Sequence, residues 1–109
     1  MPRHLLTDFE LMILLAILRV GADAYGVSIS VEIEQTTGRR VVRAAVYLAL
    51  SRMEEHGLVQ SNLGSPTRER GGRAKRFFRL TTHGMREVQD TQRALTALWS
   101  GVPALGGLA

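Results

Sequence analysis

Apolar residues recur along this chain with two different spacings, and the change of spacing marks its elements. Spacings of three and four residues predict four helices, at about residues 7–19, 25–36, 43–56 and 82–100. Residues 58–63 alternate apolar with polar side chains, as a half-buried strand does, and residues 75–80 form the expected return strand. The connection between the strands holds Gly, Pro and Arg, so we expect an exposed loop.

Local signals mark where these helices begin and end. Thr7 with Glu10 three residues later is a capping box, and Thr81 with Thr82 offers an N-cap to the last helix. The first three helices are each followed by a residue that favours termination, at Gly21, Gly38 and Gly57. The helix boundaries therefore follow from both the periodicity and the residues at the ends.

The order of the elements predicts a mainly α fold with a small β-hairpin. Two short helices joined by a tight Gly-containing turn are typical of a helix-turn-helix, and a hairpin directly after them is a wing. We expect a winged helix-turn-helix DNA-binding domain over residues 1–81. A C-terminal dimerisation helix would follow at residues 82–101, and residues 102–109 would form a flexible tail.

The first and last helices carry more apolar surface than so small a domain can cover. The first is apolar nearly all round, which is typical of a helix buried on more than one side, and it includes Leu11 and Leu15. The last has a coiled-coil-like seam with one polar position, formed by Met85, Val88, Gln92, Leu95 and Trp99. We expect both helices to pair with a second copy of the chain. Packing of the last helix on the first within one subunit is the alternative.

Length and composition bound the class of protein. A chain of 109 residues with 45% hydrophobic and 22% charged residues fits one globular domain. The absence of Cys excludes a disulfide framework and a thiolate zinc site. The longest apolar run, residues 11–18, is too short to span a bilayer, and no signal-peptide pattern precedes it. We therefore expect a cytoplasmic protein without a membrane partner.

Positive charge is concentrated on the predicted reading helix and its wing. Residues 39–79 hold ten basic and three acidic residues, a net charge of +7 against +4 for the whole chain. A basic surface of this kind indicates a polyanionic partner such as double-stranded DNA. The alternative is that this basic surface is only a solvated face that aids solubility. A membrane-surface role does not fit, because the arginines lie on a loop and hairpin rather than along one face of an amphipathic helix.

Individual basic residues suggest different contacts with DNA. Arg43 lies in the first turn of the third helix, where side chains reach base edges or phosphates. Arg39 and Arg40 precede that helix and are better placed for phosphates, while Arg52 faces outward or sideways farther along it. On the wing, we expect phosphate or minor-groove contacts from Arg73 and Lys75.

The sequence gives no support to an enzyme, a metal site or a cofactor. His4, His56 and His83 have no metal-ligand spacing, and the adjacent Glu54 and Glu55 point apart on a helix. The Gly-rich wing lacks the Walker pattern, and no Ser or Thr lies in a nucleophile elbow.

Several segments occur together in a specific order. A Tyr in the third helix is followed by Arg-Met-Glu-Glu-His-Gly-Leu-Val, by a Gly-Gly-Arg wing and by paired aromatic residues. The full set covers most of the chain, at residues 6–10, 25–27, 37–38, 45–59 and 71–81 and at Gly84. On these segments the chain resembles the PadR family of bacterial winged-helix transcriptional regulators. That family often has small polar residues where this chain has Arg43, Ala44 and Ala45.

The resemblance implies a homodimer joined through the first and last helices. It also implies operator binding near promoters, usually as a repressor, and release by a small molecule in some members. Tyr47 is carried over as a DNA contact, against the alternative of an amphipathic core tyrosine. Trp99 would be either a dimer anchor or a wall of a site for a small aromatic effector. A winged-helix protein-interaction module without DNA binding is the alternative function, and the basic balance of residues 39–79 argues against it.

Overall fold

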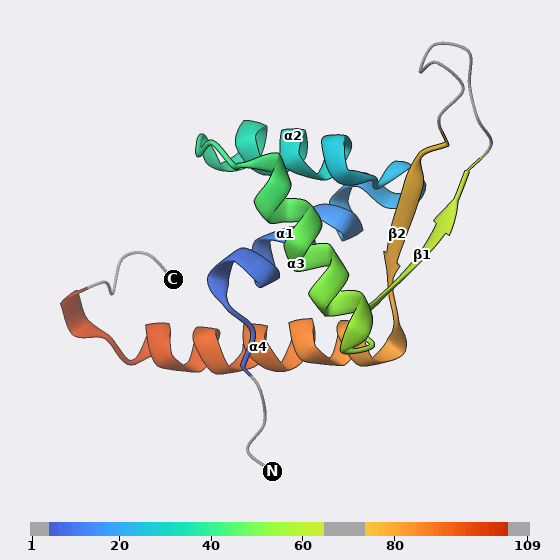
Figure 1. Cartoon of the computed structure of the whole chain (residues 1–109). Helices are drawn as coiled ribbons and strands as arrows, with labels where there is room; N and C mark the ends of the chain where they lie inside the picture. Colours follow the sequence, from blue (N-terminus) through green and yellow to red (C-terminus); the bar gives the residue numbers. More distant parts are fainter. Residues whose placement is uncertain (1–4, 65–73, 105–109) are drawn as a thin grey trace.

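The computed structural model describes residues 5–64 and 74–104 and confirms the predicted element order (Figure 1). Its helices and strands are α1 (Asp8–Val20), α2 (Gly26–Thr37), α3 (Arg43–Glu55), β1 (Val59–Leu63), β2 (Arg76–Leu80) and α4 (Thr82–Ser100). The predicted turn after α1 is a short 3-10 helix, η1 (Gly21–Asp23). Residues 65–73 of the predicted wing loop and the last five residues of the predicted tail lie outside the described residues.

The capping signals read from the sequence are present. The Thr7 hydroxyl accepts a hydrogen bond from the Glu10 N–H at 3.0 Å, and the Glu10 carboxylate accepts one from the Thr7 N–H at 2.8 Å. The hydroxyl of Thr81 accepts from the Gly84 N–H at 3.0 Å. Gly38 ends α2 with a φ of 74°, a left-handed conformation that side chains disfavour. These contacts satisfy polar groups that the helix ends would otherwise leave free.

The hairpin is tied to the start of α2 as well as to itself. β1 and β2 pair antiparallel from Val59 opposite Leu80 to Leu63 opposite Arg76. Beyond the hairpin, a β-bridge joins Phe77 to Tyr25, and the Phe78 N–H donates to the Ala24 carbonyl at 2.8 Å. Figure 1 shows the upper part of β2 beside the start of α2, where this bridge forms. The wing is therefore fixed relative to the helix-turn-helix by backbone contacts.

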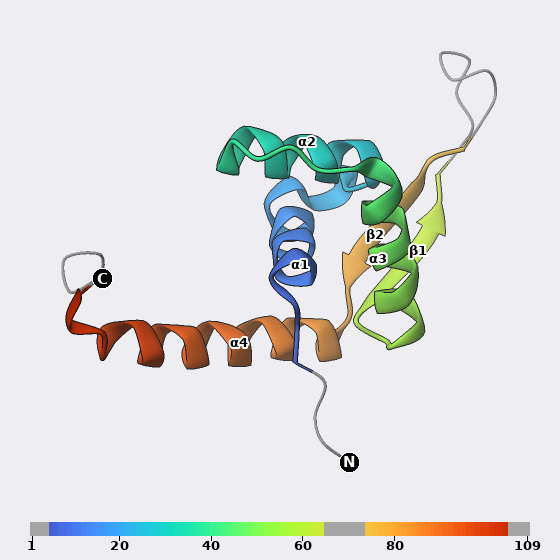
Figure 2. The same ribbon diagram turned by 60° about the vertical axis from the view of Figure 1, so that its left-hand side comes forward.

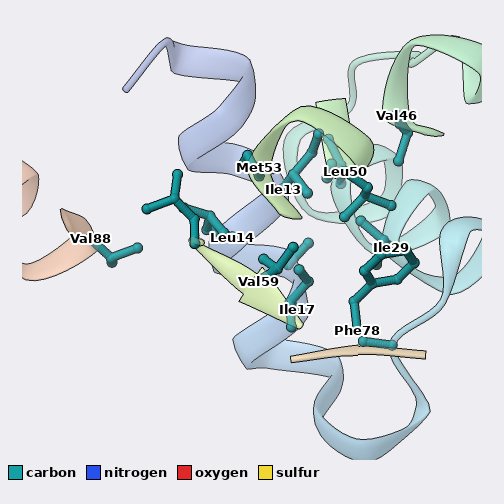
Figure 3. Close-up of a cluster of buried hydrophobic side chains, with 14 residues drawn as sticks. Ile13, Leu14, Ile17, Ile29, Val46, Leu50, Met53, Val59, Phe78 and Val88 are labelled. Atoms are coloured by element: carbon teal, nitrogen blue, oxygen red, sulfur yellow. The ribbon is translucent and has the colours of Figure 1, made fainter. Parts of the chain in front are cut away.

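A single hydrophobic core holds the helices and the hairpin together (Figure 3). The inner face of α3 is formed by Val46, Leu50 and Met53, which are spaced four and three residues apart and are all buried. They meet side chains from the other elements, chiefly Ile13, Leu14, Ile17, Ile29, Val59 and Phe78. Of the paired aromatics, Phe78 enters this core and Phe77 stays outside it, so the two side chains face opposite ways as the sequence predicts.

Only the first half of α4 belongs to the core. Gly84 presses against the backbone of Leu58, where an added Cβ would lie 2.0 Å from the Leu58 oxygen. Val88 is 6% exposed and projects toward Leu14, so it packs within the subunit rather than on an outward seam (Figure 3). From Gln92 to Ser100 every residue is exposed, and both views show this half running away from the other helices (Figures 1 and 2). Within the described ranges, none of the helices has the length and hydrophobicity needed to cross a membrane.

Candidate nucleic-acid interface

The outward face of α3 is the centre of the candidate site. Successive residues on a helix are rotated by about 100°, so Ala44 and Leu48 point away from the core, opposite the buried Val46 and Leu50. Arg43, Tyr47 and Arg52 lie to either side of these two outward positions. All five are exposed. Figure 1 shows α3 with α2 at its upper end and the hairpin beside it, the arrangement in which a reading helix faces outward.

The arginines on and just before α3 have free guanidinium groups. Arg39, Arg40, Arg43 and Arg52 are all exposed. In the part of the chain that the structure describes, none of their side chains forms a hydrogen bond or an ion pair. A free guanidinium group can take a phosphate or a guanine edge without first giving up an internal partner.

The arginines on β2 and α1 are engaged instead. Arg76 donates to the Ser61 hydroxyl at 2.9 Å, and Ser61 in turn donates to Glu54 at 2.7 Å. Both Nε and Nη2 of Arg79 donate to Gln60, at 3.2 and 2.9 Å. The described arginines of the basic segment therefore fall into two groups, those around α3 without a partner in the described ranges and those that brace the hairpin. A count of charges alone does not distinguish the two groups.

Arg19 is also held, in this case between the first two helices. Its Nε donates to the Glu32 carboxylate at 2.7 Å, and the Thr36 hydroxyl donates to the same oxygen at 2.9 Å. The hydrogen bond from Arg19, followed by that from Thr36, lowers the pKa of Glu32 below its ordinary value. The ion pair stabilises the contact between α1 and α2 away from the outward face of α3.

The loop that carries Arg39 and Arg40 has fixed backbone contacts. The Arg39 N–H donates to the Thr37 hydroxyl at 3.1 Å, and the Val41 N–H donates to the Glu34 carboxylate at 3.0 Å. These bonds place the turn between α2 and α3. The two guanidinium groups consequently project from a positioned loop at the N-terminal end of α3.

Tyr47 packs against the first residue of α2. An added Cβ at Gly26 would lie 2.2 Å from Cε1 of Tyr47 and 2.5 Å from its hydroxyl oxygen. The ring thus lies directly over the bare backbone of Gly26. Tyr47 is exposed rather than a core tyrosine, and its hydroxyl has no hydrogen-bond partner among the described residues. Sequence reasoning missed the role of Gly26, because the contact joins residues 21 positions apart.

The base of the wing is an aromatic cluster with one cation. The rings of Tyr25 and Phe77 meet edge to face with centroids 5.8 Å apart. Lys75 Nζ stands 4.4 Å from the centroid of the Tyr25 ring, a cation–π distance. Lys75 is therefore held at the base of the hairpin, and Arg73, its predicted neighbour on the wing, lies outside the described residues.

The predicted interface residues separate into two grooves. Leu11, Leu15, Leu95 and Trp99 line one groove between α1 and α4, of about 320 Å³, with Val88 at its inner end. Met85 lines a different groove with Leu18 and Phe77. The seam inferred from helical spacing is thus split, since Met85 turns toward the hairpin and Val88 into the core. Among the described residues no cluster of His, Asp or Glu side chains could hold a metal ion.

Comparisons with known proteins bear on the family and the fold. The family model described as the transcriptional regulator PadR-like family matches residues 14–90. Among curated proteins, none matches the chain.

Solved structures share the fold at low sequence identity. The chain is similar to a PadR-like transcriptional regulator from Bacillus cereus, with a TM-score of 0.72 and 20% identity over 89% of each chain. A PadR family regulator from Eggerthella lenta has a TM-score of 0.69 and 21% identity, over 86% of this chain and 80% of that one. Bacillus subtilis PadR in complex with operator DNA has a TM-score of 0.66 and 20% identity, over 78% of this chain and 46% of that one.

Proposed function

The chain belongs to the PadR-like family of transcriptional regulators, and from that premise we propose that it represses transcription by binding a specific DNA operator as a homodimer. The proposal rests on four exposed arginines around α3 whose guanidinium groups have no partner among the described residues, Arg39, Arg40, Arg43 and Arg52. Phosphate contacts supply much of the affinity of DNA-binding proteins, and unpaired guanidinium groups are suited to them. The similar Bacillus subtilis structure holds operator DNA.

Each predicted contact has a place in this proposal. Arg43 and Tyr47 would approach the bases from the first half of α3, and Arg52 would meet a phosphate farther along the same helix. Arg39 and Arg40 would bind phosphates at the N-terminal end of α3. Lys75 and Arg73 would bind the backbone or the minor groove beside the wing.

The proposed homodimer follows from the exposed half of α4. Leu95 is 43% exposed and Trp99 60% exposed, and both line the groove between α1 and α4. A second copy of this helix would cover apolar surface that the subunit leaves in water. Two-fold symmetry would then favour a pseudo-palindromic operator with half-site centres about 34 Å apart. A small aromatic effector bound beside Trp99 completes the proposal.

Salt dependence of binding tests the DNA contacts. If each subunit neutralises about four phosphates, the slope of log K against log salt should be about −7 for the dimer. The probe is the DNA upstream of the chain's own gene, measured by fluorescence anisotropy. Exchange of Arg73 and Lys75 for Ala should flatten this slope by up to about 4 and weaken all sequences alike.

Arg76→Ala is the matched control for the wing. It removes a cation from the same hairpin, but this cation is already bonded to Ser61. The slope of log K against log salt should therefore change less than in the wing double variant. An unchanged slope in the wing double variant would remove the wing from the DNA contacts. A wild-type protein that binds no duplex at low salt would overturn the proposed function.

A further inference from the structure

The outward ridge of α3 is apolar over its first half, at Ala44 and Leu48, and continues with the exposed polar residues Ser51 and Glu55. Ala44 and Leu48 stand one turn apart, directly opposite the buried Val46 and Leu50. Leu48 is 61% exposed, and Val42, the N-cap residue of α3, is 69% exposed. An isolated exposed Leu needs no explanation, but here three apolar residues gather at one end of one helix.

The flanks of this ridge are cationic and polar. Arg43 and Tyr47 lie on its α2 side and Arg52 lies on the other. The free guanidinium groups on both flanks match the two phosphate backbones that border a major groove. This charge pattern favours DNA as the occupant of the ridge over an apolar protein surface, which would leave those charges buried and unpaired.

The first half of this ridge has no side-chain donor or acceptor, so it can read only one feature of the major groove. Side chains of Ala and Leu offer no hydrogen bond to a base edge, and the apolar group that bases present there is the 5-methyl group of thymine. We propose that Leu48, with Ala44 one turn before it, selects operators by contact with thymine methyl groups. The small Ala44 allows the helix to approach the bases closely. This inference rests on the proposed DNA-binding function and adds the base feature that is recognised.

Replacement of thymine by uracil isolates this contact, because deoxyuridine lacks only the methyl group. The probe is a duplex enriched by the wild-type protein from a random-sequence library, prepared once with thymine and once with deoxyuridine throughout. Burial of one methyl group corresponds to about a fourfold change in the dissociation constant. We expect the wild-type protein to bind the thymine duplex at least about fourfold more tightly.

Two variants show which side chain reads the methyl group. Leu48→Ala should bind the thymine duplex more weakly and show a smaller preference for thymine over uracil. Leu63→Ala is the matched control, since Leu63 is about equally exposed but lies on β1, and this variant should keep the distinction. Both truncations remove exposed atoms, and thermal unfolding measured alongside should show folded protein.

The outcomes separate this inference from the proposed function. If the wild-type protein enriches no duplex, DNA binding itself fails and the inference falls with it. If it binds the enriched duplex with steep salt dependence but equally well with uracil, DNA binding stands and methyl recognition is overturned. A thymine preference of unchanged size in Leu48→Ala also overturns it, because DNA deformability or another side chain then reads the base.

Discussion

At the scale of single residues, the contact between Gly26 and Tyr47 connects sequence to recognition most directly. Gly26 has no side chain, so the Tyr47 ring can lie against the start of α2. The ring is held at one side of the outward face of α3, while its hydroxyl has no hydrogen-bond partner in residues 5–64 and 74–104. A glycine in an ordinary helical turn thus acts as a positioning residue for a proposed DNA contact.

Gly26→Ala should separate stability from DNA binding. The atoms that meet the new Cβ belong to the far end of an exposed side chain, so Tyr47 can swing away at little cost. The lost flexibility of the unfolded chain should leave stability equal or raise it by about 0.4–1 kcal/mol. Operator affinity should nevertheless fall, because Tyr47 is displaced. Urea unfolding and anisotropy with the same operator measure the two effects.

A double-mutant cycle assigns the loss of affinity to Tyr47. In a Tyr47→Ala background, Gly26→Ala should cause no further loss, since the clashing ring is gone. Gly101→Ala is the control, because its Cβ would meet only ordinary contacts at 3.7 Å or more. Full operator affinity in the Gly26→Ala single variant would show that the position of Tyr47 does not matter for binding.

The sequence could predict the role of a residue when the contacts that define the role are made with near neighbours in the chain. The Thr7 and Glu10 capping box and the glycine after each helix act within a few residues, and the structure confirms them. The free state of Arg43 and the engaged state of Arg76 could not be predicted, because Arg76 acquires its partner only when β1 and β2 pair. The contact of Gly26 with Tyr47 depends in the same way on how α2 and α3 cross.

At the scale of elements, α3 differs from α1 and α4 at its start. Thr7 and Thr81 cap those helices with their hydroxyls, whereas the N-cap of α3 is Val42, which makes no side-chain capping bond. Ser, Thr, Asp and Asn stabilise an N-cap by about 1 kcal/mol relative to an apolar residue. The chain therefore forgoes stability at the end of the helix that the proposed function directs toward DNA, a pattern typical of functional sites.

Val42→Thr should stabilise the protein by about 1 kcal/mol. Val42→Asp should do at least as well, because its charge also interacts favourably with the helix dipole. Their effects on DNA should differ. Asp places a negative charge next to the proposed phosphate sites and should weaken binding strongly, while Thr should retain most of it. Urea midpoints and operator affinities provide the comparison, and an unchanged midpoint in both variants would contradict the missing-cap argument.

At the scale of the whole molecule, the second half of α4 extends beyond the core with Leu95, Leu98 and Trp99 exposed. The subunit's extents of 55 × 35 × 21 Å reflect a wing at one side and the exposed half of α4 at the other (Figure 1). Helical spacing predicted α4 and its apolar stripe. It could not show that Val88 is already buried against α1 or that Met85 turns toward the hairpin. Spacing gives the face of a helix, and only the packed fold decides how much of that face remains free.

Leu95→Glu should produce a folded monomer that binds the operator poorly. Leu95 lies in the groove between α1 and α4 but outside the subunit core, so a charge there should oppose association more than folding. Val88 is unsuitable for this test, since a charge there would disrupt the core. Gln89→Glu is the control, because it adds the same charge at an exposed position of α4. Sedimentation at micromolar concentration reports the mass. A wild-type monomer under these conditions would refute the dimer.

The remaining prediction concerns the groove beside Trp99 as a site for an effector. Its volume of about 320 Å³ and its lining by Leu11, Leu15, Leu95 and Trp99 suit a small flat apolar compound. The alternative is that Trp99 only anchors the dimer, and both roles predict weaker association for Trp99→Ala. Fluorescence distinguishes them, because Trp99 is the sole tryptophan. An effector should quench it saturably at micromolar concentration.

The same compound should also change operator affinity over the same concentration range. If the ligand lowers the affinity of the protein for DNA by some factor, bound DNA must lower the affinity of the protein for the ligand by the same factor. Titration of a panel of planar aromatic dyes, with and without operator, therefore gives two estimates of one coupling factor. Leu11→Ala enlarges the groove and leaves Trp99 unchanged as the fluorescent residue. This variant should change the ligand affinity and the effect of the ligand on operator binding together. Saturable quenching without a change in DNA affinity would indicate a binding groove with no regulatory role, and no saturable quenching across the panel would leave Trp99 as a packing residue.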